Sequence, residues 1–145
     1  WCNLKFEIIY FYDVYGERQI KKGNMATVIG IFENQYMQNK PLTIVRPGTQ
    51  TRRFTHISDT VEICFKAWKL NKCRHYSITN KKSYSIKDVA KMFDTKIRYL
   101  PPRKGERYAS ALTNISNNNN VIRYYGKIKL KDYITSFIKS KKKNL

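Results

Sequence analysis

The chain has 145 residues, with 29 Lys and Arg against 10 Asp and Glu, so its formal net charge at pH 7 is +19. This length allows either one domain with a real hydrophobic core or a piece of something larger, and a hydrophobic content of 41% excludes a disordered tail. No apolar run approaches the roughly 20 residues that a membrane-spanning helix needs, so we expect no membrane segment.

The chain shows no sign of export. Its first residues, WCNLKFEII, contain neither Met nor the basic and apolar regions of a signal peptide, and we expect that a segment upstream of Trp1 is missing. Cys2, Cys64 and Cys73 lack the C-x-x-C spacing of zinc sites, and only two His accompany them. Free thiols in a reducing compartment are therefore predicted, and a cytoplasmic location with them.

The positive charge is spread along the chain. Residues 1–50 carry 6 basic and 4 acidic groups, residues 51–100 carry 12 and 4, and residues 101–145 carry 11 and 2. A strongly basic domain attracts polyphosphate, so a basic nucleic-acid-binding module is one alternative. The gradual distribution, together with many Asn, Ile and Tyr residues, favours a general compositional bias, and we do not expect nucleic acid to be the partner.

Short β-branched runs alternate with amphipathic helical stripes, a pattern typical of an α/β fold. The first run, residues 4–11, is nearly continuous in its second half, as in a strand buried on both faces of a parallel sheet. A loop follows over residues 12–24, and an apolar stripe predicts a helix over residues 25–37. Short strands are then expected at residues 42–45 and 53–57.

The next helix is predicted from its start signal. Asp59 with Glu62 three positions on resembles a capping box, so we expect the helix to begin there. Its apolar residues recur at helical spacing and form one face, which we expect to be exposed in this chain because the strands meant to cover it are missing. These residues are Val61, Cys64, Phe65 and Trp68.

Two strands and two helices are expected in the remainder. The strands are residues 75–79 and residues 96–100, the second ended by two prolines. Ser85 with Asp88 predicts the start of one helix. After a polar stretch, an apolar stripe that begins at Leu130 predicts the last helix.

The residues alone reveal no catalytic set. His56 and His75 are the only imidazoles, neither is near Ser or Cys in a nucleophile motif, and capping or packing is the expected role for such a His. The chain also contains no G-x-G-x-x-G phosphate-binding turn.

Two features do suggest a ligand. The sequence YFYDVYG, residues 10–16, follows a buried strand, and ligands of α/β sheets bind at the carboxyl ends of strands. Arginines also occur in two turns, residues 47–54 and residues 101–107, and two guanidinium forks can clamp one diphosphate. The alternative is that both turns are merely basic and solvated.

The order of these motifs is similar to a known family. The chain resembles the extended short-chain dehydrogenase/reductases in four segments, which are, in order, DVYGERQ, PLTIVRPGTQTRRFTHISDTVE, YSITNKKSYSIKDVAKMF and LPPRKGER. The members that it resembles are the NAD-dependent sugar-nucleotide epimerases and dehydratases, of which the UDP-glucose 4-epimerases are typical. The resemblance covers nearly all of the chain. Its most specific part is the middle motif, which consists of Gly48, Gln50, Arg52, Phe54 and Asp59.

The resemblance implies a role for several residues. Arg52 and Arg103 would hold the diphosphate of a nucleotide sugar such as a UDP-sugar. Phe11 and Tyr12 would lie beside the nicotinamide of NAD, and Val45 would contact the nucleotide base.

Asp13 would also contact the substrate, and it departs from the family, which has Asn at this position. A carboxylate that faces a diphosphate repels it unless the carboxyl is protonated or turned aside. The pose of the substrate therefore depends on the charge state and orientation of Asp13.

The resemblance also shows which motifs of the family the chain lacks. The family binds NAD at a Gly-rich turn and uses a Tyr-x-x-x-Lys pair, and we find neither in a matching context. We therefore expect a C-terminal half only: the last strands of a Rossmann-type parallel sheet plus a small α/β substrate-binding lobe. It would grip the nucleotide diphosphate, be inactive alone, depend on a missing N-terminal half, and form a homodimer when complete.

The expected domain division follows the motifs. Residues 1–24 and 57–80 are assigned to the dinucleotide-binding domain, and residues 25–56 and 81–145 to the substrate-binding lobe. A second alternative to this interpretation is a non-catalytic sugar-nucleotide binder that folds and binds by itself.

Overall fold

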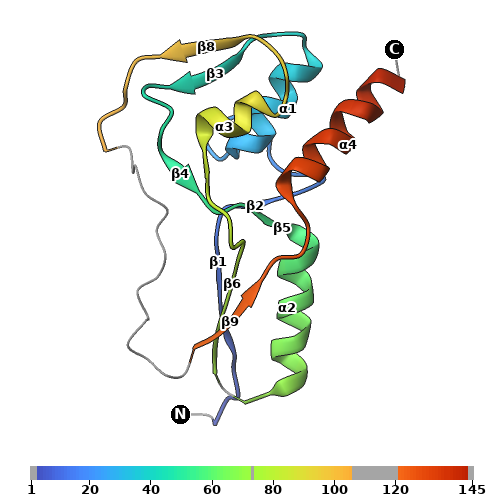
Figure 1. The fold of residues 1–145 in the computed structure, drawn as a ribbon. Helices are drawn as coiled ribbons and strands as arrows, with labels where there is room; N and C mark the ends of the chain where they lie inside the picture. Colours follow the sequence, from blue (N-terminus) through green and yellow to red (C-terminus); the bar gives the residue numbers. More distant parts are fainter. Residues whose placement is uncertain (1–2, 73, 106–120, 144–145) are drawn as a thin grey trace.

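The structure is a computed structural model that describes residues 3–72, 74–105 and 121–143. Strands and helices alternate along most of the chain (Figure 1). In chain order they are β1 Ile8–Phe11, β2 Val14–Tyr15, α1 Val28–Met37, β3 Leu42–Val45, β4 Thr51–Arg52, β5 Thr55–His56, α2 Ile57–Leu70, β6 His75–Thr79, β7 Tyr84–Ser85, α3 Ile86–Lys91, β8 Ile97–Leu100, β9 Val121–Tyr125 and α4 Leu130–Lys143.

The largest sheet has three parallel strands in the order β1-β6-β9. Helix α2 runs along this sheet in Figure 1. Ile63 and Ala67 of α2 pack with Tyr76 and Ile78 of β6, and all four side chains are almost fully buried. The apolar alternation of β6 therefore gives one face of the sheet its core.

A second core lies at the other end of the molecule. There β3 pairs in parallel with β8, β4 pairs antiparallel with β7, and helices α1, α3 and α4 pack around them (Figure 1). Phe32 of α1 and Phe93 after α3 are fully buried, with ring centroids 5.9 Å apart in an edge-to-face arrangement. Leu130 and Ile134 attach α4 to the same core.

The predicted α/β class is confirmed, and several element bounds agree with the sequence. The strand expected at residues 42–45 is β3, and the strand expected at residues 75–79 is β6. Ser85 caps α3, since its hydroxyl accepts a hydrogen bond of 3.0 Å from the backbone N–H of Asp88, as the start signal predicted.

Other bounds differ from the prediction. The first strand is shorter than expected, Ile8–Phe11, and is only half-buried, because among the described residues β6 is its one strand neighbour. Of the strand expected at residues 53–57, only Thr55–His56 is a strand, β5, and Ile57 already belongs to α2. β4, Thr51–Arg52, lies before the predicted range. β9 was not predicted as a strand; it lies in the predicted lobe of residues 81–145, yet it pairs with β6 of the three-stranded sheet.

The predicted start of α2 was wrong. The helix begins at Ile57 with His56 as its N-cap, and the Asp59 carboxylate instead accepts a bond of 3.1 Å from the backbone N–H of Ile128, just before α4. Its apolar face is largely exposed, as expected, with Phe65 52% and Trp68 69% exposed. Ile63 and Ala67, on another face of α2, make the contact with the sheet.

Two further sequence expectations concern cysteines and membranes. Cys64 is a free thiol, whereas Cys2 and Cys73 lie outside the described residues. Within the described ranges, no helix is both long and apolar enough to cross a bilayer.

Candidate functional site

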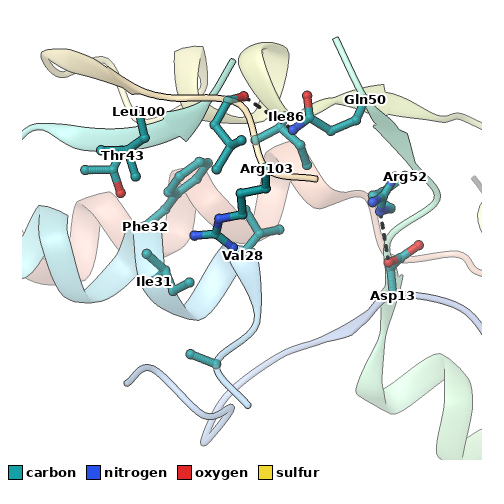
Figure 2. Close-up of a pocket in the computed structure, with 12 residues that line it drawn as sticks. Asp13, Val28, Ile31, Phe32, Thr43, Gln50, Arg52, Ile86, Leu100 and Arg103 are labelled. Atoms are coloured by element: carbon teal, nitrogen blue, oxygen red, sulfur yellow. Dashed lines mark hydrogen bonds and ion pairs between the residues drawn. The ribbon is translucent and has the colours of Figure 1, made fainter. Parts of the chain in front are cut away.

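Four of the residues predicted to bind substrate line one pocket. Asp13 follows β1, Val45 ends β3, Arg52 ends β4 and Arg103 follows β8, so four separate segments bring them together. The pocket has a volume of about 310 Å³ (Figure 2). Its other lining residues are Ala26, Val28, Ile31, Phe32, Thr43, Gln50, Ile86 and Leu100.

The turn between β3 and β4 places Arg52 at the pocket. Gly48 has a φ of +78° and a Cβ there would lie 2.8 Å from Ile44 Cγ2, so a glycine is needed. Gln50 is 3% exposed and its Nε2 donates to the Val45 carbonyl at 3.4 Å, which ties the turn to β3. Arg52 stands opposite Tyr84 of β7. Gly48 and Gln50 of the middle motif therefore fix this turn.

Asp13 and Arg52 form the charged end of the pocket. Asp13 Oδ1 and Arg52 Nε are 3.9 Å apart, and both side chains are partly shielded from solvent (Figure 2). Burial raises the pKa of the Asp13 carboxyl above its ordinary value, opposed by the Arg52 charge and by a hydrogen bond from the Arg53 backbone N–H. Asp13 thus holds its negative charge less readily than a solvated aspartate.

Arg103 approaches the same pocket from another side. Figure 2 shows its side chain extending from the segment after β8 over Val28 of α1, while Arg52 faces Asp13. Val28, Ile31 and Phe32 supply apolar surface beneath it. Apolar walls with a few charged groups are typical of small-molecule sites, and low polarity strengthens the attraction of each guanidinium for an anion.

The structure does not bring Phe11 and Tyr12 into this pocket. Phe11 is the last residue of β1 and is 50% exposed, and Tyr12 follows it with a half-buried side chain. Both lie at the carboxyl end of a parallel strand, next to Asp13 in sequence.

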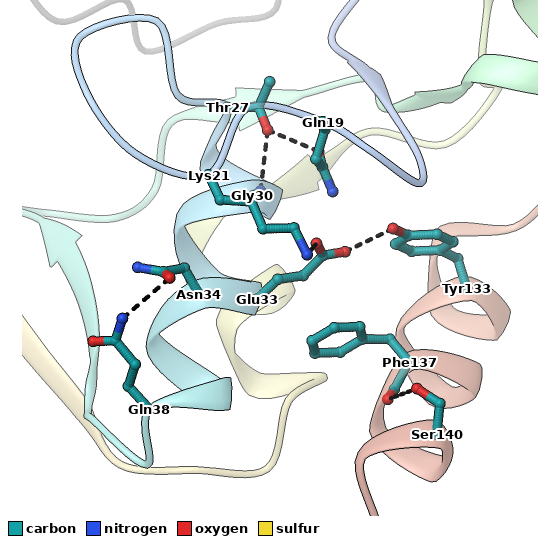
Figure 3. Close-up of polar contacts among 10 residues, drawn as sticks. All are labelled: Gln19, Lys21, Thr27, Gly30, Glu33, Asn34, Gln38, Tyr133, Phe137 and Ser140. Carbon is teal, nitrogen blue, oxygen red and sulfur yellow. Dashed lines mark hydrogen bonds and ion pairs between the residues drawn. The ribbon is translucent and has the colours of Figure 1, made fainter. Parts of the chain in front are cut away.

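A buried polar network between α1, α4 and the loop before α1 was not predicted from the sequence. Glu33 of α1 is 1% exposed; one of its oxygens accepts a hydrogen bond of 2.7 Å from the Tyr133 hydroxyl of α4, and the other is 3.0 Å from Lys21 Nζ (Figure 3). Thr27 caps α1 and also donates to Gln19 at 2.7 Å. The network joins the loop between β2 and α1 to the helices α1 and α4. The one sign of it in the sequence was the acidic residue Glu33 next to the core residue Phe32.

The two histidines have structural partners, as expected. His56 Nδ1 accepts a hydrogen bond of 3.2 Å from the Ser58 backbone N–H as the cap of α2, and its ring lies edge-on to Tyr15 with centroids 5.2 Å apart. His75 Nδ1 is 2.9 Å from the Tyr10 hydroxyl. Across the described part of the chain, no group of three His, Cys, Asp or Glu could hold a metal ion.

Comparison with known proteins shows the class of protein. Residues 2–79 match the model of the NAD dependent epimerase/dehydratase family. This match covers more than half of the chain, and the chain belongs to that family.

Individual relatives are sugar-nucleotide epimerases. The putative UDP-glucose 4-epimerase of Methanocaldococcus jannaschii is 32% identical over 114 residues, which are 73% of this chain and 36% of the relative. The UDP-glucuronic acid 4-epimerase of Bacillus cereus, solved with UDP-glucuronic acid and NAD, is 25% identical with a TM-score of 0.75, over 98% of this chain and 46% of that one. The UDP-glucose 4-epimerase of Thermotoga maritima shares the fold at 22% identity and a TM-score of 0.74, over 97% and 47%.

These comparisons correct one expectation. The first half of the chain, residues 2–79, matches the family model, so the description of the chain as a C-terminal, substrate-binding half without its NAD-binding region is wrong. The expectation relied on the absence of two short motifs, the Gly-rich turn and the Tyr-x-x-x-Lys pair, whereas a family match depends on many positions together. The chain nevertheless spans only 36% of the M. jannaschii relative and just under half of the solved structures.

Proposed function

We propose that the protein binds a nucleotide sugar, such as a UDP-sugar, and takes part in an NAD-dependent epimerase or dehydratase reaction. The observation that carries this proposal is the convergence of Asp13, Val45, Arg52 and Arg103 on one pocket. Arg52 and Arg103 would clamp the diphosphate, since planar guanidinium groups bind two phosphate oxygens at once. Val45 would contact the base.

NAD is the cofactor that the family description names. Phe11 and Tyr12 fit its nicotinamide, because the half-exposed Phe11 ring stands at the carboxyl end of β1, where parallel sheets bind such ligands. Bound NAD would supply hydride transfer to and from a sugar carbon. The part of this chain would be to orient the nicotinamide and the nucleotide sugar, in an enzyme of the isomerase or lyase class.

We also propose that α2 packs against further polypeptide. Phe65 and Trp68 form an exposed aromatic pair with ring centroids 5.7 Å apart, beside the exposed Val61. Contiguous exposed apolar surface of this kind marks an interaction site. Its occupant would be an additional segment of a longer chain or a second copy in the predicted homodimer. A cytoplasmic location remains part of the same prediction.

Neither alternative function has support from the comparisons, which return epimerases. A nucleic-acid-binding module predicts affinity for DNA or RNA that falls steeply with salt. A self-sufficient sugar-nucleotide binder predicts full binding by these residues alone, despite the apolar face of α2.

Titration calorimetry of the purified protein with UDP-glucose tests the proposed clamp. Arg52→Ala and Arg103→Ala are each expected to weaken binding by about tenfold to a hundredfold, as the loss of a charge-assisted hydrogen-bond pair should. Arg98→Ala is the matched control, because Arg98 is an exposed residue of β8 outside the pocket. Unchanged affinity in both pocket variants would refute the clamp.

A further inference from the structure

A carboxylate stands in the pocket to which we assign an anionic ligand. Asp13 lines this pocket together with Arg52 and Arg103, and these three are the charged groups among the lining residues that the structure describes. An adjoining cavity of about 180 Å³ also has Asp13 in its wall and is otherwise lined by uncharged residues of β2, α1 and the segment next to β5. Within the described residues, the positive charges that share the pocket with Asp13 are therefore those of the two arginines that the ligand would need.

The contact between Asp13 and Arg52 is too loose to hold the two groups as a fixed pair. At 3.9 Å, Oδ1 and Nε are beyond hydrogen-bond distance. Arg52 also donates from Nη1 to the Thr51 carbonyl at 2.8 Å. The guanidinium can thus remain in place on β4 when Asp13 changes its charge.

The backbone keeps Asp13 at the pocket. Its φ of +41° is in the left-handed region, and its carbonyl accepts a hydrogen bond of 3.3 Å from the Thr55 backbone N–H of β5. This hydrogen bond to β5 holds the Asp13 backbone at the pocket, so the carboxyl stays within a side chain's length of an arriving ligand. Protonation is then the simplest way to remove the repulsion.

We propose that Asp13 makes the affinity of the pocket for a diphosphate depend on a proton, which Asp13 takes up from solution as the ligand binds. This inference rests on the proposed function. The ligand's negative charge disfavours the carboxylate, so the carboxyl in the complex binds its proton more tightly than in the free protein. Affinity is then greatest when Asp13 is already protonated and falls with rising pH until Asp13 is ionised in the complex as well.

The partly buried environment agrees with this direction. Burial raises the pKa of Asp13 in the free protein, and the Arg52 charge and the Arg53 N–H oppose that rise. A bound anion would offset the Arg52 charge and so raise the pKa of Asp13 further. The pH window of the effect therefore begins above the ordinary aspartate value of 3.8.

Titration calorimetry with UDP-glucose from about pH 4.5 to about pH 8 tests this inference, with affinity expected to fall by up to tenfold per pH unit inside the window. Buffers of different ionisation enthalpy should reveal proton uptake on binding. Asp13→Asn should remove the pH dependence and bind about tenfold more tightly at the upper end of the range. Asp94→Asn is the matched control, since Asp94 is exposed, lies outside the pocket and also has a left-handed φ, +48°.

The outcomes separate the two proposals. This inference would be overturned, and the proposed function left intact, by either of two results. The first is wild-type binding that requires Arg52 and Arg103 but takes up no proton. The second is a pH dependence of affinity that persists in Asp13→Asn. Absence of any binding of UDP-glucose would overturn the proposed function itself.

Discussion

Loss of the Tyr133 hydroxyl should destabilise the fold measurably, because it leaves a buried carboxylate short of one partner. Glu33 is 1% exposed and accepts from the Tyr133 hydroxyl at 2.7 Å (Figure 3). A hydrogen bond to a charged group contributes about 1.5–3 kcal/mol. Lys21 Nζ, 3.0 Å from the other Glu33 oxygen, remains in Tyr133→Phe, so the larger penalty of an uncompensated buried charge does not apply.

We therefore expect Tyr133→Phe to lower the free energy of unfolding by about 2 kcal/mol, and Tm by roughly 5–10 °C. Urea and thermal unfolding of the purified protein measure both. Tyr36→Phe is the matched control: the Tyr36 ring packs on Phe93 and Phe137 of the same core, and no hydrogen bond of its hydroxyl is found among the described residues. Equal losses in the two variants, or a loss below about 0.5 kcal/mol in Tyr133→Phe, would refute the role of the network.

Two further predictions concern alkaline pH and the outer face of α2. Burial and the hydrogen bond to Glu33 raise the pKa of Tyr133 above its ordinary value of 10.0. The stability that this group contributes is therefore present below about pH 10 and is lost as pH rises through the raised pKa. Urea unfolding between about pH 8 and pH 11 should show a steeper fall in the free energy of unfolding for the wild type than for Tyr133→Phe, and parallel curves would contradict this. Trp68→Gln should lower Tm, or yield a smaller species by size-exclusion chromatography with light scattering, if the 69%-exposed Trp68 packs against further polypeptide. Lys72→Gln, an exposed change just after α2, should do neither, and identical behaviour of the two variants would argue against an occupied face.

Local sequence signals predicted the parts of the fold that depend on local physics. Leu42–Val45 is a strand because of its β-branched run, and Ser85 caps α3 because its hydroxyl reaches the Asp88 N–H. The arginine-bearing turns could be connected to Asp13 only through the family resemblance, and the structure then places Arg52 and Arg103 in one pocket with it.

The remaining features depend on contacts between distant segments. Helical periodicity identified an apolar stripe on α2 but could not show that Ile63 and Ala67, on another face, meet the sheet. The partner of Glu33 is Tyr133, 100 residues further along the chain. Local sequence patterns cannot predict a contact between residues so far apart. β9 was missed because its five residues, VIRYY, follow an asparagine-rich stretch that is typical of loops.

The central claim is that Arg52 and Arg103 hold the diphosphate of a nucleotide sugar. A crystal structure of the purified protein with UDP-glucose tests it most directly. We predict phosphate oxygens about 2.7–3.0 Å from guanidinium nitrogens of both arginines, with Asp13 beside them. A diphosphate bound at any place beyond the reach of both Arg52 and Arg103 would contradict the claim.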